Sequence, residues 1–188
     1  MINLIYFISD THFCQKSIIP YCHRPFGSVD EMNEKLIENW NSVVKKDDKV
    51  YFLGDFCLGD LSEKRDILNR LNGYKIIVKG NHEDEINVQS LMNLGWDEAY
   101  VCPTELMYVD KDKKVQSILL SHQPQYISDN QFNIHGHIHD ALLENEYPDM
   151  NPNNHLCVSV EVIDYRPISF EEIQKEYLEN FFNKRKED

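Results

Sequence analysis

The stretch of the sequence with the clearest potential for chemistry is His135-Gly136-His137-Ile138-His139, which follows an apolar run. Residues two positions apart in an extended segment point to the same side, so His137 and His139 can face one pocket together. Neutral imidazole is the commonest protein ligand for transition metals. Taken alone, the stretch is compatible with a metal site and with a polar loop that happens to be rich in histidine.

Potential ligands also follow four short runs that are mostly apolar, as is typical of buried strands. Ile2 to Ser9 is followed by Asp10-Thr11-His12, Val50 to Leu53 by Gly54-Asp55, Tyr74 to Val78 by Gly80-Asn81-His82-Glu83, and Ser117 to Leu120 by Ser121-His122. The carboxyl ends of strands are where open α/β sheets bind their ligands. Each group alone has a structural alternative, such as Asp10 capping a turn, but ordinary turn residues would rarely recur in this way.

Helices are expected between the first strands, because apolar residues recur there at helical spacing and follow residues that can cap a helix. The predicted helices run from Ser28, with Glu31 as capping-box partner, to about Lys45, from Ser62 to Leu71, and over residues 85–94 before Gly95. An irregular insert, Cys14 to Gly27, separates the first strand from the first helix.

After residue 95 the pattern changes from alternating strands and helices to strands alone, which indicates a second, partly antiparallel sheet. Its predicted strands are Glu98 to Val101, Leu106 to Val109, Val115 to Leu120 and, closing the sheet, Cys157 to Val162. A loop spans Asp140 to Asn154, and Ser169 with Glu172 caps a last helix to about Lys184. The fold class is therefore α/β, with two sheets.

Length and composition favour one globular domain over residues 1–188, since 41% of the residues are hydrophobic. A formal net charge of -13 disfavours long polyanions, so no long nucleic acid is expected as a partner. The five cysteines include no Cys-x-x-Cys pair, which argues against a disulfide framework and a thiolate zinc site. Because a basic leader and a run of about 20 apolar residues are both lacking, we expect a soluble, cytoplasmic protein without membrane contact.

The candidate ligands together form a set that is too large for a single ion. They are Asp10, His12, Asp55, Asn81, His122, His137 and His139, all at predicted strand ends. Two divalent ions about 3.5 to 4 Å apart need a set of this kind. Mixed imidazole, carboxylate and amide ligands suit Mn²⁺, Fe²⁺, Co²⁺, Ni²⁺ or Zn²⁺, so we expect two divalent transition-metal ions.

These residues resemble the motifs of the calcineurin-like metallophosphoesterase superfamily. The matching blocks are Asp10-x-His12, Gly54-Asp55, Gly80-Asn81-His82-Glu83, His122 and Gly136-His137-x-His139, in the superfamily's order. The resemblance implies that one ion is held by Asp10, His12 and His139, the other by Asn81, His122 and His137, and that Asp55 bridges both. It also implies a two-sheet mixed β-sandwich flanked by helices, the four-layer αββα fold.

The resemblance further implies hydrolysis of a phosphate ester. A hydroxide that bridges the metals would attack phosphorus, because a metal can lower the pKa of bound water from about 15.7 to about 7. His82 would be the general acid that protonates the leaving group. Glu83 or Asp84 could orient His82, although an ordinary acid at a helix N-terminus is the favoured interpretation.

One motif departs from a branch of the superfamily. In the serine/threonine phosphatases the bridging aspartate begins a GDxxDRG motif, whereas residues 54–60 here read GDFCLGD. A phosphoprotein phosphatase is therefore a poor match, and phosphate-binding arginine must come from elsewhere. Arg24 and neighbouring His23, in the insert after the first strand, are candidates for substrate binding, although this stretch could equally be a packed loop. Tyr126 is a further candidate for the pocket lining.

The sequence thus predicts a binuclear metal-dependent phosphoesterase that acts on a small phosphomonoester or phosphodiester, nucleotide-like substrates included. Two dications contribute four positive charges, Asp10 and Asp55 remove two and a hydroxide one, which favours an anionic substrate. One alternative is a nuclease of the same superfamily, which would need a basic track. Another is a non-catalytic metal-binding scaffold, which should show gaps in the ligand set. Natural substrate, physiological metal and oligomeric state are left open.

Overall fold

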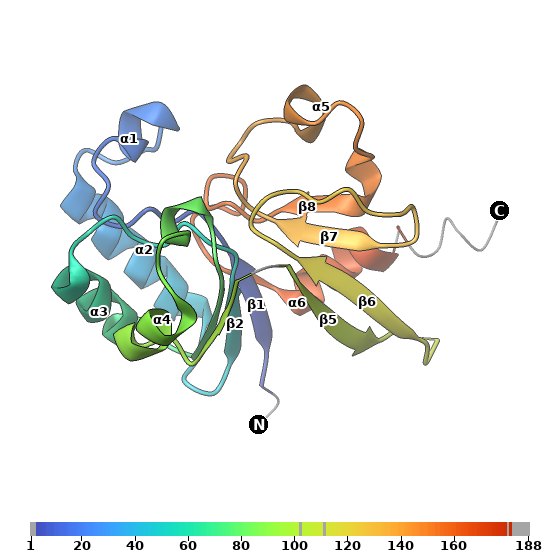
Figure 1. Cartoon of the computed structure of the whole chain (residues 1–188), viewed down its shortest axis with the longest axis horizontal. Coiled ribbons are helices and arrows are strands. Elements are labelled where there is room, and N and C mark those ends of the chain that lie inside the picture. Colours follow the sequence, from blue (N-terminus) through green and yellow to red (C-terminus); the bar gives the residue numbers. More distant parts are fainter. Residues whose placement is uncertain (1–2, 102, 111, 180, 182–188) are drawn as a thin grey trace.

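The computed structural model describes residues 3–101, 103–110, 112–179 and 181, and contains two mixed sheets with flanking helices (Figure 1). The five-stranded sheet has the order β4-β3-β2-β1-β9. Its strands are β1 (Ile5–Ile8), β2 (Lys49–Phe52), β3 (Tyr74–Val78), β4 (Glu98–Tyr100) and β9 (Ile168–Ser169). β1 to β4 run parallel to one another, and β9 is antiparallel to β1.

The four-stranded sheet has the order β5-β6-β7-β8 and confirms the second sheet expected from the sequence. Its strands are β5 (Thr104–Val109), β6 (Val115–Leu120), β7 (Phe132–His135) and β8 (His155–Cys157). β5 and β6 are antiparallel, whereas β6, β7 and β8 are parallel.

Two strand predictions are wrong. β4 was expected in the second sheet, but it pairs with β3 in the first. The closing strand was expected over Cys157 to Val162, but β8 ends at Cys157. Beyond that residue the chain crosses to the first sheet, where Ser159 forms a parallel bridge with Ser9. The alternating pattern after Cys157 therefore reflects a contact that joins the carboxyl end of β1 to the second sheet.

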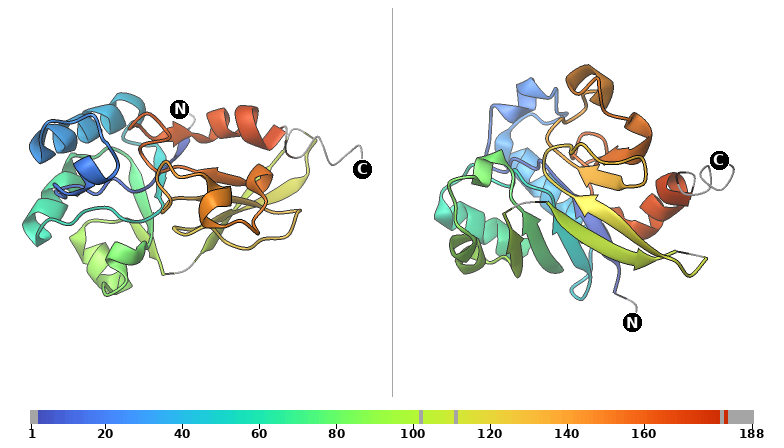
Figure 2. Two further views of the ribbon diagram at one scale, coloured as in Figure 1. Left: turned by 90° about the horizontal axis from the view of Figure 1, so that it is seen from above. Right: turned by 45° about the vertical axis from the view of Figure 1, so that its right-hand side comes forward.

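Three helices cover one face of the five-stranded sheet, and the four-stranded sheet packs on the other (Figure 2). They are α2 (Val29–Val43), α3 (Leu61–Arg70) and α4 (Val88–Leu94). Met32, Leu36 and Trp40 of α2 recur at helical spacing and are all buried, which confirms the predicted helix.

The helix caps differ in part from those predicted. Ser28 caps α2 as expected, but the Glu31 carboxylate accepts a hydrogen bond from Gly27 N and not from Ser28 N. α3 begins earlier than predicted, because Asp60 is its N-cap and accepts from the amides of residues 62 and 63. α4 begins at Val88, after its N-cap Asn87, which is later than predicted. Residues before it form the separate short 3₁₀ helix η1 (Asn81–Glu83).

Side chains of the central strands alternate between two cores, which explains why these strands are apolar throughout. Tyr6 and Ile8 pack with the helices, whereas Phe7 between them belongs to the core between the sheets. Phe52 and Leu53 divide in the same way. A strand with both faces covered needs apolar side chains on both, and the prediction of doubly buried strands is confirmed.

The last described elements are α6 (Phe170–Ile173) and its continuation as a π-helical turn, η3 (Gln174–Leu178). Ser169 and Glu172 form the predicted capping box. Buried side chains of both elements join the core between the sheets. The end expected near Lys184 lies outside the described residues. Within the described chain, every helix is too short or too polar to cross a membrane.

Short elements lie above the sheets in segments expected to be irregular. The insert after β1 contains α1 (Ile18–Tyr21), and the segment expected to be a loop contains α5 (Leu143–Glu146) and η2 (Pro152–Asn154). Figure 1 shows α1 and α5 on the same side of the molecule, at the top of the view. A small cluster of Ile138, Leu143 and Met150 packs α5 onto the chain that leaves β7.

Candidate metal centre

The carboxyl ends of β1 and β2 continue side by side beyond the regular strands. Asp10 N donates to Gly54 O at 3.0 Å, and His12 N donates to Asp55 O at 3.1 Å. Ser9 N donates to Val158 O at 2.9 Å, which brings the second sheet to the same point. Because these backbone segments are paired, the side chains of residues 10, 12 and 55 are held close together.

The backbone of this region is strained at the residues predicted to bind metal. Asp10, His12, Asp55, His137 and His139 all have left-handed backbone, with φ between 48° and 72°. Residues other than glycine rarely adopt this conformation, and it costs on the order of 1–3 kcal/mol per residue. Such strain persists where the surroundings enforce it, and it clusters at functional sites.

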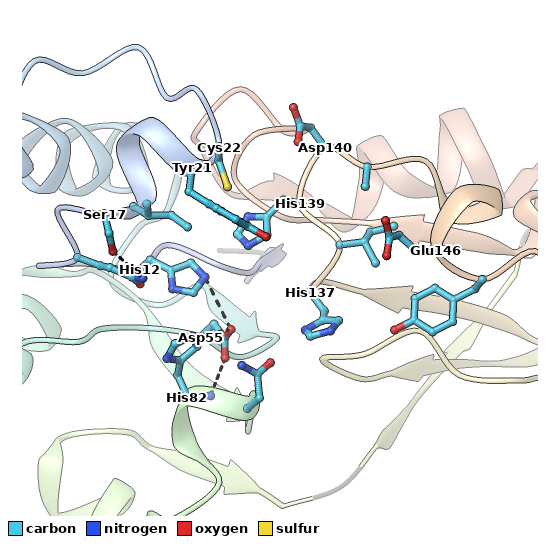
Figure 3. A pocket seen from close by; sticks show the side chains of 16 residues that line it. His12, Ser17, Tyr21, Cys22, Asp55, His82, His137, His139, Asp140 and Glu146 are labelled. Carbon is cyan, nitrogen blue, oxygen red and sulfur yellow. Dashed lines mark hydrogen bonds and ion pairs between the residues drawn. The ribbon is translucent and has the colours of Figure 1, made fainter.

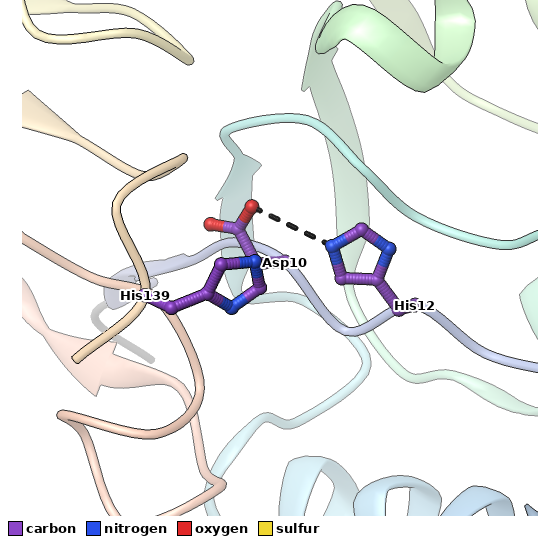
Figure 4. Close-up of side chains that lie close together, drawn as sticks. All are labelled: Asp10, His12 and His139. Atoms are coloured by element: carbon purple, nitrogen blue, oxygen red, sulfur yellow. Dashed lines mark ion pairs between the residues drawn. The ribbon is translucent and has the colours of Figure 1, made fainter. Parts of the chain in front are cut away.

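Asp10 has one oxygen that is hydrogen-bonded and one that is not. Its Oδ2 accepts from His137 N at 2.9 Å and from the Ser159 hydroxyl at 2.7 Å. Its Oδ1 is buried without a hydrogen-bond partner in the described structure. The carboxylate is therefore fixed by one oxygen and presents the other toward His12, as Figure 4 shows.

His12 is buried, with 2% of its surface exposed, yet neither of its ring nitrogens has a hydrogen-bond partner among the described residues. Its Nε2 lies 3.8 Å from Asp10 Oδ1 and 3.7 Å from Asp55 Oδ2. Burial lowers the pKa of His12 to about 4, so the ring is neutral at pH 7 and keeps a lone pair. A buried polar atom without a partner costs about 1–3 kcal/mol, which a cation between these atoms would offset.

Asp55 lies at the centre of the cluster (Figure 3). Its Oδ1 accepts from His82 N at 3.0 Å, while Oδ2 faces the Nε2 atoms of His12, His82 and His122 at 3.7, 3.7 and 3.5 Å. Burial alone would raise the pKa of Asp55, but contacts with His122 and the other neighbours lower it to about 2. An ionised carboxylate oxygen that faces several imidazoles is suited to bridge two cations.

A second group of ligand atoms converges around His122. Its Nδ1 lies 2.7 Å from Leu53 O, a carbonyl that can only accept, so Nδ1 is the donor. Its Nε2 then faces Asn81 Oδ1 at 2.9 Å and His137 Nδ1 at 3.1 Å. Burial alone would lower the pKa of His122, but Asp55 and Asp10 raise it to about 9. Asn81 Oδ1, His122 Nε2 and His137 Nδ1 thus converge on one point, and each of these atoms can offer a lone pair to a cation.

Two glycines are required for this close approach. A Cβ at Gly136 would lie 2.1 Å from Ser9 Oγ and 2.4 Å from Asp10 Oδ2. A Cβ at Gly80 would lie 2.3 Å from Asp55 Oδ1. The glycines in the two sequence blocks are therefore explained by the packing of backbone against the central carboxylates.

The donor set fits divalent cations. Ligand atoms of Asp10, His12 and His139 lie within 4.8 Å of one another, as do those of Asp10, Asp55 and His122. The structure thus brings the seven residues predicted from the sequence close together: Asn81 and His137 lie beside His122, and Asp55 lies between His12 and His122. His12, Asp55 and His82 form a further group within 4.8 Å, so His82 faces the same space.

Arg24 differs from the expectation that it binds substrate. Its guanidinium is buried, donates to the carbonyls of Asp10 and Thr11 at 2.7 Å each, and pairs with Glu161 at 2.6 Å. No donor group is left to reach a ligand, and the side chain does not line the pocket. Arg24 instead stabilises the strained backbone after β1 through the carbonyls of Asp10 and Thr11, which corrects its predicted role.

Two glutamates important to this arrangement were missed or misread from the sequence. Glu161 Oε1 lies 3.1 Å from His139 Nδ1 and accepts from Arg24 Nε at 2.8 Å, so it connects the two. Glu83 is buried, and its carboxylate accepts from the amides of Asp55, Phe56 and Gly80 at 2.9 Å each. Glu83 therefore joins two loops and does not orient His82. The only sequence signal for Glu161 is an acid among valines in a strand-like segment.

A cavity of about 620 Å³ opens over the cluster (Figure 3). Its floor includes His12, Asp55, Asn81, His137 and His139, and its walls come from α1, η1 and α5. His82 also lines it and is 34% exposed. Two weaker candidates, His23 and Tyr126, are exposed and are not part of the lining. Within the described chain, no lysine or arginine lines this cavity.

Comparisons with known proteins agree with this geometry. Residues 4–185 match the family model described as calcineurin-like phosphoesterase. The chain is 39% identical over 181 residues to an uncharacterized protein of Methanocaldococcus jannaschii, a match that covers 91% of this chain and 89% of that protein. It is also similar to the crystal structure of a protein of unknown function from Aquifex aeolicus, with a TM-score of 0.69, 30% identity, and coverage of 93% of this chain and 99% of the other.

Proposed function

The chain belongs to the calcineurin-like phosphoesterase family, and from this premise we propose that it is a binuclear, metal-dependent hydrolase of small phosphate esters. Its clustered aspartates and histidines fit a metal-dependent phosphoesterase. The observation that supports the proposal most is the set of buried, unpartnered ligand atoms: Asp10 Oδ1 and both ring nitrogens of His12. Buried polar atoms are almost always paired, so these three atoms support a site that binds a cation.

The first ion would be held by Asp10, His12 and His139, the second by Asn81, His122 and His137, and Asp55 would bridge them. When bound, two such ions supply Lewis acidity, which activates water near neutral pH and offsets the charge of a phosphoryl group. The mixture of imidazole, carboxylate and amide oxygen suits Mn²⁺, Fe²⁺, Co²⁺, Ni²⁺ or Zn²⁺.

His82 is the residue best placed to protonate the leaving alkoxide. It lines the cavity, is 34% exposed and is not needed for either predicted ligand group. Its own backbone amide is fixed by Asp55 Oδ1 at 3.0 Å, and its Nε2 lies 3.7 Å from Asp55 Oδ2. A proton held at Nε2 is therefore close to the atoms around which the ester would bind.

Two alternatives are less well supported. A nuclease would need basic residues along the path of the strand, but within the described chain the cavity is lined by neither lysine nor arginine. A scaffold that had lost its chemistry should lack part of the ligand set, yet all seven predicted residues and His82 are present.

The proposal is tested with metal-free protein, to which Mn²⁺, Ni²⁺ or Zn²⁺ is added, on bis(p-nitrophenyl) phosphate and p-nitrophenyl phosphate. We expect metal-dependent turnover, two bound ions per chain, and loss of turnover in Asp55→Ala. His23→Ala, an exposed histidine outside the cavity, is the matched control for His82→Ala. Because p-nitrophenolate leaves without much need of a proton, His82→Ala should slow an alkyl ester more than a nitrophenyl ester. Folded protein that binds no metal would refute the proposal.

A further inference from the structure

The cavity differs in charge between its floor and its rim. On the floor, two dications would contribute four positive charges and Asp10 and Asp55 remove two, which leaves the floor positive. The rim includes Asp140 and Glu146, both exposed, and within the described chain neither lysine nor arginine lines the cavity to balance them. With both ions bound, the cavity would therefore be positive at the depth of the cluster and negative at its mouth.

Two tyrosines stand at the same rim. Tyr21 of α1 is 78% exposed, and its ring lies edge-on to His139 with the centroids 6.4 Å apart. Tyr147 follows α5 and is half-buried against the cluster that packs α5 onto the chain after β7. Figure 3 shows Tyr21 extending over His139, with Asp140 and Glu146 farther along the rim. Aromatic faces combined with carboxylates are suited to an ammonium group through cation–π and ionic attraction.

The unpartnered atoms of the floor fix where a phosphate would be placed. Asp10 Oδ1 and the His12 ring nitrogens are buried, and His12 Nε2 faces both Asp10 Oδ1 and Asp55 Oδ2, so cations and phosphate would bind at this depth. The rest of the substrate must then extend past His137 and His139 toward the acidic rim. A second phosphate there would meet like charges, which disfavours polyphosphates and polynucleotides.

We propose that the substrate of this pocket is a phosphate ester of a cationic alcohol, with one phosphate on the floor and an ammonium group at the rim. This inference rests on the phosphoesterase activity proposed above. In the hydrolysis, the oxygen of water forms a bond to phosphorus, the bond from phosphorus to the ester oxygen breaks, and the alcohol leaves with a proton from His82. Water supplies the proton that restores His82, so no further reactant is needed.

The test measures binding of three non-hydrolysable phosphonates of matched size to Mn²⁺-loaded protein by calorimetry. They are 2-aminoethylphosphonate, propylphosphonate and phosphonoacetate, which carry a positive, a neutral and a negative group at the far end. Partly exposed ion pairs are each worth a factor of about 1.5 to 5, so two rim carboxylates should favour 2-aminoethylphosphonate over propylphosphonate by about 2- to 25-fold.

Charge-neutral variants separate the rim from the floor. In the double variant Asp140→Asn, Glu146→Gln we expect 2-aminoethylphosphonate to bind more weakly and phosphonoacetate to bind more tightly. This comparison holds even if phosphonoacetate touches the metals directly, because the floor is unchanged. Glu144→Gln removes the same charge from α5 at an exposed residue outside the cavity, and it should leave all three affinities as they are.

The outcomes distinguish this inference from the proposed function. Metal-dependent binding of all three phosphonates, with no preference for the cation or with a preference that survives in the double variant, would overturn the inference and leave the phosphoesterase proposal standing. Phosphonate binding that does not depend on Mn²⁺, or no binding to metal-loaded protein, would count against both. Tighter binding of a neutral nucleoside phosphonate than of 2-aminoethylphosphonate would assign the rim to stacking and refute the cationic substrate.

Discussion

Replacing Glu161 by glutamine removes one negative charge behind the metal cluster while keeping the size of the side chain. The side chain of Glu161 is 4% exposed, and its Oε1 lies 3.1 Å from His139 Nδ1 and 2.6 Å from Arg24 Nη2. Burial alone would raise the pKa of Glu161, but His139 and Arg24 lower it to about 2, so the carboxylate is ionised at pH 7. A carboxylate that accepts Nδ1–H leaves the lone pair on Nε2 of His139 and would make that atom a stronger ligand for the proposed metal ion.

The expected effect is selective for one of the two proposed metal sites. Loss of such an outer partner weakens metal binding by about 10- to 100-fold, which is about 1.4 to 2.7 kcal/mol. The site formed by Asp10, His12 and His139 should therefore weaken by this factor. The site formed by Asn81, His122 and His137 should change little, because none of the contacts of Glu161 reaches it.

Glu161→Gln is assayed by calorimetric titration of metal-free protein with Mn²⁺. Because the variant leaves the buried Arg24 charge without its partner, the free energy of unfolding should also fall by about 3 kcal/mol or more. If the variant fails to fold, Arg24→Met combined with Glu161→Leu removes both charges and still deprives His139 of its partner. Two sites with unchanged affinity in a folded variant, or equal weakening of both, would refute the reasoning. Glu144→Gln is the control for loss of an exposed carboxylate.

Three other predictions concern the packing and the metals. Gly136→Ala places a Cβ 2.1 Å from Ser9 Oγ, so the melting temperature should fall by an amount equivalent to about 1–3 kcal/mol. A variant with unchanged melting temperature and metal content would contradict this role for the glycine. Glu83→Gln leaves one carbonyl oxygen for three amides that now donate to a carboxylate, so urea denaturation should show that the free energy of unfolding falls by about 2–4 kcal/mol. A fall of less than about 1 kcal/mol would mean that the two loops are stable without this carboxylate. Removal of metal by EDTA should lower the melting temperature, because a ligand at 100 times its Kd stabilises the folded state by about 2.7 kcal/mol per site. A melting temperature that calorimetry finds unchanged would count against the metal centre.

The residue types at the strand ends could be read from the sequence because they depend on local pattern. Apolar runs with both faces buried mark the strands, and parallel strands bring their carboxyl ends to one edge of a sheet. Asp10 follows such a run directly, and Asp55 and Asn81 follow theirs after one and two further residues. The candidate ligand residues could therefore be picked out from the sequence alone, and the second sheet and the helix that begins after Ser28 could be predicted from it.

Tertiary structure alone decided the contacts between residues that are far apart in the chain. Arg24 pairs with Glu161, 137 residues away, and Asp10 accepts from Ser159, 149 residues away. Without those partners, Arg24 looks like a free phosphate ligand, and β4, which has three residues, gives no local sign of which sheet it joins.

The physical reason is that side-chain type and periodicity are properties of a segment, whereas hydrogen-bond partners are properties of the packed chain. A sequence shows which groups could bind a metal or a phosphate. Whether a group is free to do so depends on what the fold places beside it. Asp10 and Arg24 both follow β1, yet packing left an oxygen of Asp10 without a partner and occupied the guanidinium of Arg24.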